Sequence, residues 1–226
     1  MTFLELVHEL HREAGVAGST VASVTGQSGE ALRLVMWIKQ AWHELQLERE
    51  NWWWMRKQFS LTTSASDNTY TAADCSPAVT DLSEWRVKSL RTYTQSIGVT
   101  DQMQIAFKQY DEFRDIFLIR TTQEQRPTHF TVAPDMSLIF GPAPDVAYVV
   151  TGEYQAAPSS MAADSDEPTG LPAHFHMAIV FGALMKYGAF ESASEVFAYA
   201  KDRYDYYVSK LELNQLDEIV AGAPLA

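Results

Sequence analysis

The 226-residue sequence contains only one cysteine, Cys75. A single thiol cannot form an internal disulfide, so nothing in the sequence requires an oxidising compartment. Long hydrophobic runs are also missing, since no apolar stretch approaches the ~20 residues needed to cross a bilayer. The N-terminus lacks the basic region and apolar segment of a secretory signal. We therefore expect no membrane span and no export signal.

Basic residues are scarce, with 17 Lys and Arg against 29 Asp and Glu, which gives a formal net charge of −12. An acidic surface repels phosphate backbones and argues against sequence-specific DNA binding. It also disfavours attachment to anionic lipid. The simplest interpretation is that the charge keeps the protein soluble. A second interpretation is a surface past which DNA moves without sticking.

Recognisable catalytic and metal-binding motifs are absent as well. The sequence has no G-x-S-x-G, Walker A or dinucleotide fingerprint. Glu5 and His8 have the spacing of a di-iron ligand pair, but a di-iron bundle needs a second such pair, which neither central helix supplies. His174 and His176 lie two positions apart on an expected helix and so point in different directions. These patterns predict no metal ligands.

The acidic run Asp164–Glu167 resembles the opening of a calcium loop. Pro168 at position 5 and Phe175 at position 12 do not fit that loop. We interpret the run as a solvated loop that prepares the N-terminus of the next helix, where carboxylates favour the helix dipole. Because no nucleophile is paired with a base, we expect no catalytic residue, no cofactor and no enzymatic activity.

The strongest positive pattern is the stretch Glu30–Met55. Its apolar residues recur at i, i+3, i+4 and i+7, which predicts a helix of about five or six turns. The stretch ends in Trp52, Trp53 and Trp54. Successive side chains on a helix are separated by ~100°, so three neighbouring indoles cannot all face one way. They form a core-filling corner or, alternatively, one of them anchors a protein–protein contact.

Three further helices are expected. Thr2–Ala14 opens with a Thr2–Glu5 capping box. A third helix starts at Leu171-Pro172, with the proline at its first helical position. A second capping box, Ser192 with Glu195, starts the last helix, which runs to about Asn214 with Phe197, Ala200, Tyr204, Tyr207, Val208 and Leu211 facing inward.

Between the helices the apolar period changes from 3.6 to 2. The pattern predicts short strands at 58–63, 85–93, 103–107, 128–133, 137–140 and 147–155, with a slip between Val87 and Leu90 that indicates a bulge. Asp111–Leu118 interrupts them with a helical pattern capped by Asp111. Closely spaced short strands favour an antiparallel sheet or small sandwich over βαβ units.

The predicted fold class is therefore α+β. Residues 1–57 and 158–214 form a four-helix bundle from both termini, and an antiparallel β-sheet or sandwich module, 58–157, is inserted into it. Residues 215–226 form a flexible C-terminal tail that cannot fold by itself. Its apolar residues could fill a groove on a partner, which makes contact candidates of Leu216, Ile219, Val220 and Leu225.

The order of these segments resembles the head–tail adaptor (connector) proteins of tailed bacteriophages, the broad group that includes tail tubular protein A. Four stretches carry the resemblance: the helix Ile38–Trp42 leading to Asn51-Trp52; Leu138–Pro144 followed by Tyr148 and Gly152–Tyr154; Asp164–Pro172 followed by His176; and Ala183–Gly188. Together they span residues 30–190, and none of them is catalytic.

The resemblance implies a homo-oligomeric ring, commonly a dodecamer, docked under the portal protein in the virion neck after assembly in the host cytoplasm. The helical part would face the portal and the β part a downstream tail or neck protein, and DNA would pass through the lumen without specific binding. Should the lining prove basic, Arg86, Lys88 and Arg91 are the first candidates for gripping DNA. Two alternatives remain, a tail-associated glycan-binding or hydrolytic β module and a small soluble helical regulator.

Overall fold

The computed structural model describes residues 1–119 and 123–216. The chain forms two compact units, Met1–Trp54 together with Pro158–Ala226, and Met55–Ala157. Helices make up the first unit, which we call the helical unit, and strands dominate the second, the β unit. The predicted α+β class is confirmed. Within the described residues no helix has both the length and the apolar composition to cross a membrane.

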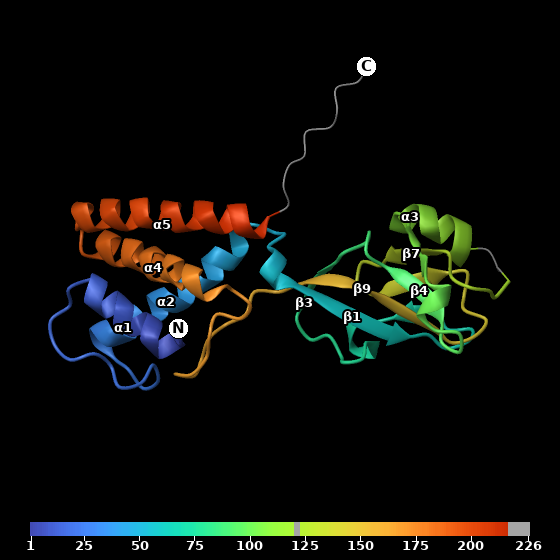
Figure 1. Ribbon diagram of the computed structural model, residues 1–226, viewed down its shortest axis with the longest axis horizontal. Coiled ribbons are helices and arrows are strands. Elements are labelled where there is room, and N and C mark those ends of the chain that lie inside the picture. Colours follow the sequence, from blue (N-terminus) through green and yellow to red (C-terminus); the bar gives the residue numbers. More distant parts are fainter. Residues whose placement is uncertain (120–122, 217–226) are drawn as a thin grey trace, which may run out of the picture. The chain divides into compact units, whose positions relative to one another are not determined.

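The helical unit is organised around one central helix. Figure 1 shows α4 between α5 and the pair α1 and α2, and α4 packs against all three. Their bounds are α1 Phe3–Glu13, α2 Gly29–Leu47, α4 His176–Phe190 and α5 Ser194–Gln215. Most residues of α4 itself are apolar or small, on every side of the helix, as expected for a helix buried on several sides. The finer geometry of a four-helix bundle stays a prediction.

The N-terminal helix begins where the sequence predicts. The Glu5 amide donates to Thr2 Oγ1 at 3.3 Å, and the Thr2 amide donates to Glu5 Oε2 at 2.8 Å, which completes the capping box. Helix α2 spans 19 residues, in agreement with the predicted five or six turns, and Ser28 is its N-cap residue. Local sequence patterns are therefore sufficient to place both helices.

The starts of the two C-terminal helices differ from the prediction. Pro172 does not begin α4; it precedes the 3-10 turn η5, Ala173–Phe175, and α4 starts at His176. The Ser192 capping box is also wrong, because Ser192 has φ 55° and α5 starts two residues later. The Ala193 amide donates to the Gly188 carbonyl at 2.9 Å. Ser192 belongs to this tight turn between α4 and α5, so it does not occupy the N-cap position of α5.

The β unit contains two sheets. One has the order β1-β9-β4-β5, with β3 also paired to β9, and the other has the order β2-β8-β7-β6. The strands are β1 Arg56–Thr62, β2 Thr69–Tyr70, β3 Leu82–Trp85, β4 Arg91–Thr94, β5 Met103–Gln104, β6 Ala106–Phe107, β7 His129–Val132, β8 Leu138–Gly141 and β9 Tyr148–Ala156. Among the described strands only β6 and β7 pair in parallel, and the other pairs are antiparallel, as the sequence predicted.

Both sheets contribute to one core. Phe59 and Trp85 from the first sheet lie in the same buried cluster as Phe130 and Phe140 from the second. The Trp85 indole N–H donates to the Met136 carbonyl at 2.7 Å, which joins β3 to the turn between β7 and β8. Buried polar groups need such partners, so the bond fixes the depth at which Trp85 inserts.

Two predicted strands are each divided in the structure. Residues 103–107 form β5 in one sheet and β6 in the other, and Ile105 is buried where the chain changes sheet. Residues 85–93 are not one bulged strand, because a turn separates β3 from β4. That turn is held by the Arg86 amide, which donates to the Glu153 carbonyl at 2.9 Å. Alternation alone cannot distinguish one bent strand from two.

The helical insertion is short and is capped elsewhere than expected. Helix α3 spans Tyr110–Phe113 and continues as a π-helical turn, Arg114–Leu118, with Gln109 rather than Asp111 as its N-cap. A Cβ on Gly141 would lie 2.7 Å from Phe117 and 2.8 Å from Phe113. Glycine therefore lets both rings rest on β8, and this packing, which the sequence does not reveal, sets the register of the helix.

Candidate interaction surfaces

The tryptophan triplet divides into buried and exposed members. Trp52 has no exposed surface, and its indole N–H donates to the Leu45 carbonyl at 3.1 Å, near the end of α2. The same carbonyl also accepts from the Glu48 amide at 3.4 Å, so two donors meet at the last turn of α2. Trp54 stacks on Trp42 with ring centroids 5.4 Å apart. Trp52 and Trp54 thus close the corner of the helical unit.

Trp53 is 44% exposed, and the three indoles do not share one direction. As a large aromatic side chain at the surface, Trp53 stays the contact candidate of the triplet. Leu216 caps α5 and is half-buried. The other predicted contact residues, Ile219, Val220 and Leu225, lie outside the described residues.

The acidic run that resembles a calcium loop serves as a structural tie. The Asp164 carboxylate accepts from the Val24 amide at 2.6 Å and from the Ser23 hydroxyl at 3.1 Å. Asp166 accepts from the Ala162 and Ala163 amides, which lowers the pKa of its carboxyl group. These carboxylates hold the loop before α2 and their own turn, rather than preparing the N-terminus of α4 as the sequence suggested.

The histidines also have structural partners. His8 Nε2 lies 2.8 Å from the Val21 carbonyl, and His176 Nε2 lies 3.1 Å from the Leu171 carbonyl. Burial lowers the pKa of His176, so its ring is neutral near pH 7. His174 is exposed beside Phe175. Across residues 1–119 and 123–216, no three His, Cys, Asp or Glu side chains are placed to share a metal ion.

The basic residues considered as candidates for DNA binding lie at one turn of the β unit. Arg86 and Lys88 belong to the turn between β3 and β4, and Arg91 begins β4. They line two hollows of about 390 and 580 Å³. Glu153 lines both hollows and Glu84 lines the smaller one, so carboxylates interrupt the positive charge. A strip of this kind is not the continuous basic surface that retains phosphates.

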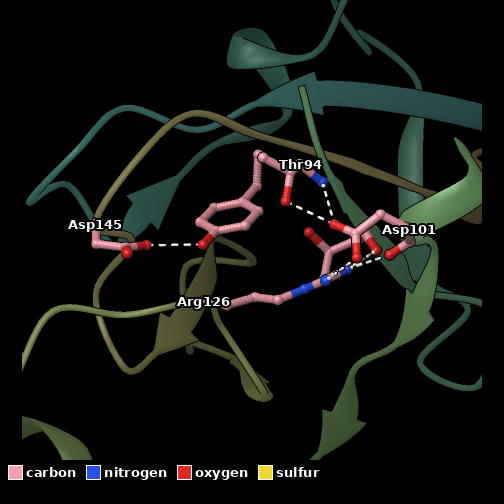
Figure 2. A network of polar contacts seen from close by, with 6 residues as sticks. Thr94, Asp101, Arg126 and Asp145 are labelled. Carbon is pink, nitrogen blue, oxygen red and sulfur yellow. Dashed lines mark hydrogen bonds and ion pairs between the residues drawn. The ribbon is translucent and has the colours of Figure 1, made fainter. Parts of the chain in front are cut away.

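A polar network pins one loop of the β unit (Figure 2). Arg126 donates to Asp101 through Nη1 at 2.8 Å and donates from Nη2 to the carbonyls of Asp101 at 2.6 Å and Thr92 at 2.7 Å. The Thr94 hydroxyl and amide both donate to Asp101 Oδ2, at 2.6 and 3.2 Å. The guanidinium thus ties the loop after β4 back to the strand itself.

Electrostatics keep this network charged at neutral pH. Hydrogen bonds from Thr94 and then Arg126 lower the pKa of Asp101. On the other side of Arg126, the Tyr148 hydroxyl donates to Asp145 at 2.8 Å. Burial, and then this bond, raises the pKa of Tyr148 to about 12. The Arg126–Asp101 ion pair therefore persists through the physiological pH range.

The pinned loop presents apolar side chains to solvent. Ile97, Val99, Met103 and Val146, which we call the apolar tip, are between 45% and 67% exposed. The Gln95 amide donates to the Ala147 carbonyl at 3.2 Å and joins the loop of Ile97 and Val99 to the loop of Val146, whereas Met103 lies on β5. Exposed apolar residues on a rigid support are typical of protein contacts. Sequence reasoning missed this surface; its only signal was the pair of apolar residues flanking Gly98.

Comparison with known families gives one result that covers both units. The family model described as SU10 adaptor protein matches residues 1–225. No curated protein matches the chain. The family match extends over the tryptophan corner, the basic turn and the apolar tip.

Proposed function

This chain belongs to the SU10 adaptor protein family, a family of bacteriophage adaptors, and we propose that it is a structural head–tail adaptor. It forms a homo-oligomeric ring under the portal protein and connects the capsid to the tail. Its place is the virion neck, and it is incorporated during assembly in the host cytoplasm. The observation that carries this proposal is the family match over residues 1–225, which includes both units.

The exposed surfaces support separate partners for the two units. The helical unit carries Trp53 and faces the portal, whereas the β unit carries the apolar tip and faces a downstream tail or neck protein. Aromatic and apolar side chains at the surface are enriched in protein interfaces. The support for the tip is its polar network, since a pinned loop loses little conformational entropy when it binds.

The ring encloses the DNA channel and lets DNA pass without specific binding. The net charge of −12 supports this role, because like charges oppose adhesion of phosphates. Only charges within a Debye length of ~8 Å of the DNA matter at physiological salt. The mixture of Arg86, Lys88 and Arg91 with Glu84 and Glu153 gives at most a weak, interrupted attraction. Assembled rings should not retard duplex DNA in a gel at moderate salt.

The deciding experiment is a mass measurement of the protein alone and after mixing with the portal protein of its phage. We expect a stoichiometric complex containing a ring, with twelve copies as the family's usual number. A protein that stays monomeric and binds no portal would refute the proposal and favour a small soluble regulator.

The alternative of a glycan-binding or hydrolytic β module has less support. Sugar sites need aromatic faces and carboxylates that converge on one accessible pocket. The hollows of the β unit contain Glu84 and Glu153, but their aromatic residues, Phe59 and Trp85, are buried in the core. Binding of a cell-surface glycan to the isolated protein would reverse this ranking.

A further inference from the structure

The outer side of α5 carries a second stripe of side chains that its own unit covers only in part, since Tyr199 and Arg203 touch Phe181 of α4. The helix buries Ala200, Val208 and Leu211 against its neighbours. Away from this face, residues spaced alternately by four and three positions form a row that we call the α5 ridge: Tyr199, Arg203, Tyr206, Lys210 and Leu213. Tyr199, Tyr206 and Leu213 are exposed. Such spacing is the pattern with which one helix packs against a partner.

The cations of the ridge are supported by aromatic rings rather than by carboxylates. The Arg203 guanidinium lies 5.5 to 5.6 Å from the ring centres of Phe181, Tyr206 and Tyr207. The Lys210 ammonium lies 6.0 Å from the ring of Tyr206. Among residues 1–119 and 123–216 neither cation forms an ion pair, unlike Lys186 and Lys201. In a chain with many more acidic than basic residues, this ridge is positioned to receive carboxylates.

The same helical unit has a hollow with a small excess of negative charge. A cavity of about 360 Å³ lies between α2, α4 and α5 and is bordered by two carboxylates, Glu44 and Glu48, and one cation, Lys186. Lys186 pairs with Glu44 at 2.7 Å, and Glu48 accepts a hydrogen bond from Tyr204, so cations from outside would join an existing polar cluster. Small residues, Ala41, Gly182 and Ala189, leave it open. A Cβ on Gly182 would lie 3.2 Å from Tyr204, so glycine also preserves the space. We call this site the acidic hollow.

The ridge and the hollow lie on different sides of α5. Tyr204 lines the acidic hollow, and Tyr206 belongs to the ridge. Two positions along a helix correspond to a rotation of ~200°, so these side chains point in nearly opposite directions. Complementary sites on opposite sides of one subunit produce a head-to-tail contact, which closes into a ring when the rotation permits. A contact between two ridges would instead bring unpaired cations together.

We propose that the α5 ridge of one copy docks into the acidic hollow of the next. Tyr206 enters the hollow, and Arg203 and Lys210 face Glu44 and Glu48 across the contact. This inference rests on the proposed ring and identifies the surfaces that would join its subunits.

The test uses two full-length variants that each lose one side of the contact. Arg203→Glu with Lys210→Glu disables the ridge, and Glu44→Gln with Glu48→Gln disables the hollow. Each variant alone, mixed with portal protein, should need about thirtyfold or more higher concentration to assemble, as expected when a charge pair at a contact is broken. The matched control is Lys201→Glu, on the same helix but outside the ridge, which should assemble like the wild type. Thermal melting confirms that all variants fold.

An equimolar mixture of the two defective variants gives the sharpest result. An intact ridge on one variant can meet an intact hollow on the other, but the chain of contacts stops there, so native mass measurement should detect heterodimers and no ring. Rings from the mixture, or no heterodimers at all, would overturn the inference. Normal assembly of both variants would overturn it while leaving the adaptor proposal intact, whereas a wild-type protein that forms no ring with the portal would overturn both.

Discussion

Replacing Trp52 by alanine should destabilise the helical unit far more than the same change at Trp53. Trp52 is fully buried and closes the end of α2 through its bond to the Leu45 carbonyl, whereas Trp53 is 44% exposed. Truncation of a buried tryptophan to alanine costs about 3–5 kcal/mol. A surface substitution usually changes the stability by about 0.5 kcal/mol or less, and partial burial of Trp53 extends this to about 1 kcal/mol.

A third variant, Trp52→Phe, separates packing from hydrogen bonding. Phenylalanine retains much of the apolar ring but leaves the Leu45 carbonyl without the indole donor. The Leu45 carbonyl keeps the Glu48 amide as a donor at 3.4 Å, so the expected cost of about 1–3 kcal/mol comes from one lost hydrogen bond and from the ring volume that phenylalanine lacks. It should therefore lie between the costs of Trp53→Ala and Trp52→Ala.

The assay is urea unfolding followed by far-ultraviolet circular dichroism, which reports mainly on the helical unit and does not depend on tryptophan emission. The difference between free energies of unfolding gives each cost, provided that the transition of this unit is cooperative. Equal destabilisation by Trp52→Ala and Trp53→Ala would refute the assignment of a buried and an exposed indole. If Trp53 contacts a partner, Trp53→Ala should also fold normally yet assemble poorly with the portal.

Three further predictions concern the rest of the chain. Gly152→Ala should lower the stability of the β unit by about 1–3 kcal/mol, because the new Cβ would lie 2.9 Å from Phe59 and 3.1 Å from Leu90. Thermal melts followed by near-ultraviolet circular dichroism measure the loss, and an equal loss in the control Thr151→Ala, at the neighbouring strand position, would contradict the close-packing argument. Ile97→Ser with Val99→Ser should leave the melting temperature unchanged but weaken binding to the downstream tail protein, measured by co-sedimentation, whereas unaltered binding would remove the apolar tip from the interface. Burial lowers the pKa of His176 and of His129 below the ordinary 6.5, so the unfolded chain binds protons more readily and the stability measured by urea unfolding should fall as the pH decreases through 6.5. His176→Gln should reduce this dependence of stability on pH, and an unchanged dependence would show that His176 is not the titrating group.

Several residues that mark the family resemblance have identifiable packing roles. Gly152 lets Phe59 and Leu90 approach β9, and Gly141 carries the rings of α3 and the turn that follows it. A Cβ on Gly188 would lie 2.8 Å from the Phe197 amide nitrogen, so glycine permits the close crossing of α4 and α5. These residues looked like an unexplained pattern in the sequence because each one responds to a contact with a distant segment.

Patterns in the sequence were sufficient to predict the α+β class, the α2 helix and the capped start of α1. These features depend on periodicity and on side chains three or four positions apart, and both are local properties of the chain. The excess of acidic residues and the single cysteine are likewise compositional facts that no fold can change.

Packing between distant segments determines which apolar side chains are buried and which are left for partners. Trp52 and Trp53 are adjacent and chemically identical, and the Leu45 carbonyl and the aromatic stack beside Trp42 decide between them. The same holds for α5, where Tyr204 lines a hollow within the unit and Tyr206 is exposed. A periodic pattern indicates that a helix has an apolar face, but the neighbour that covers it comes from elsewhere in the chain, and that neighbour is set by packing rather than by local sequence.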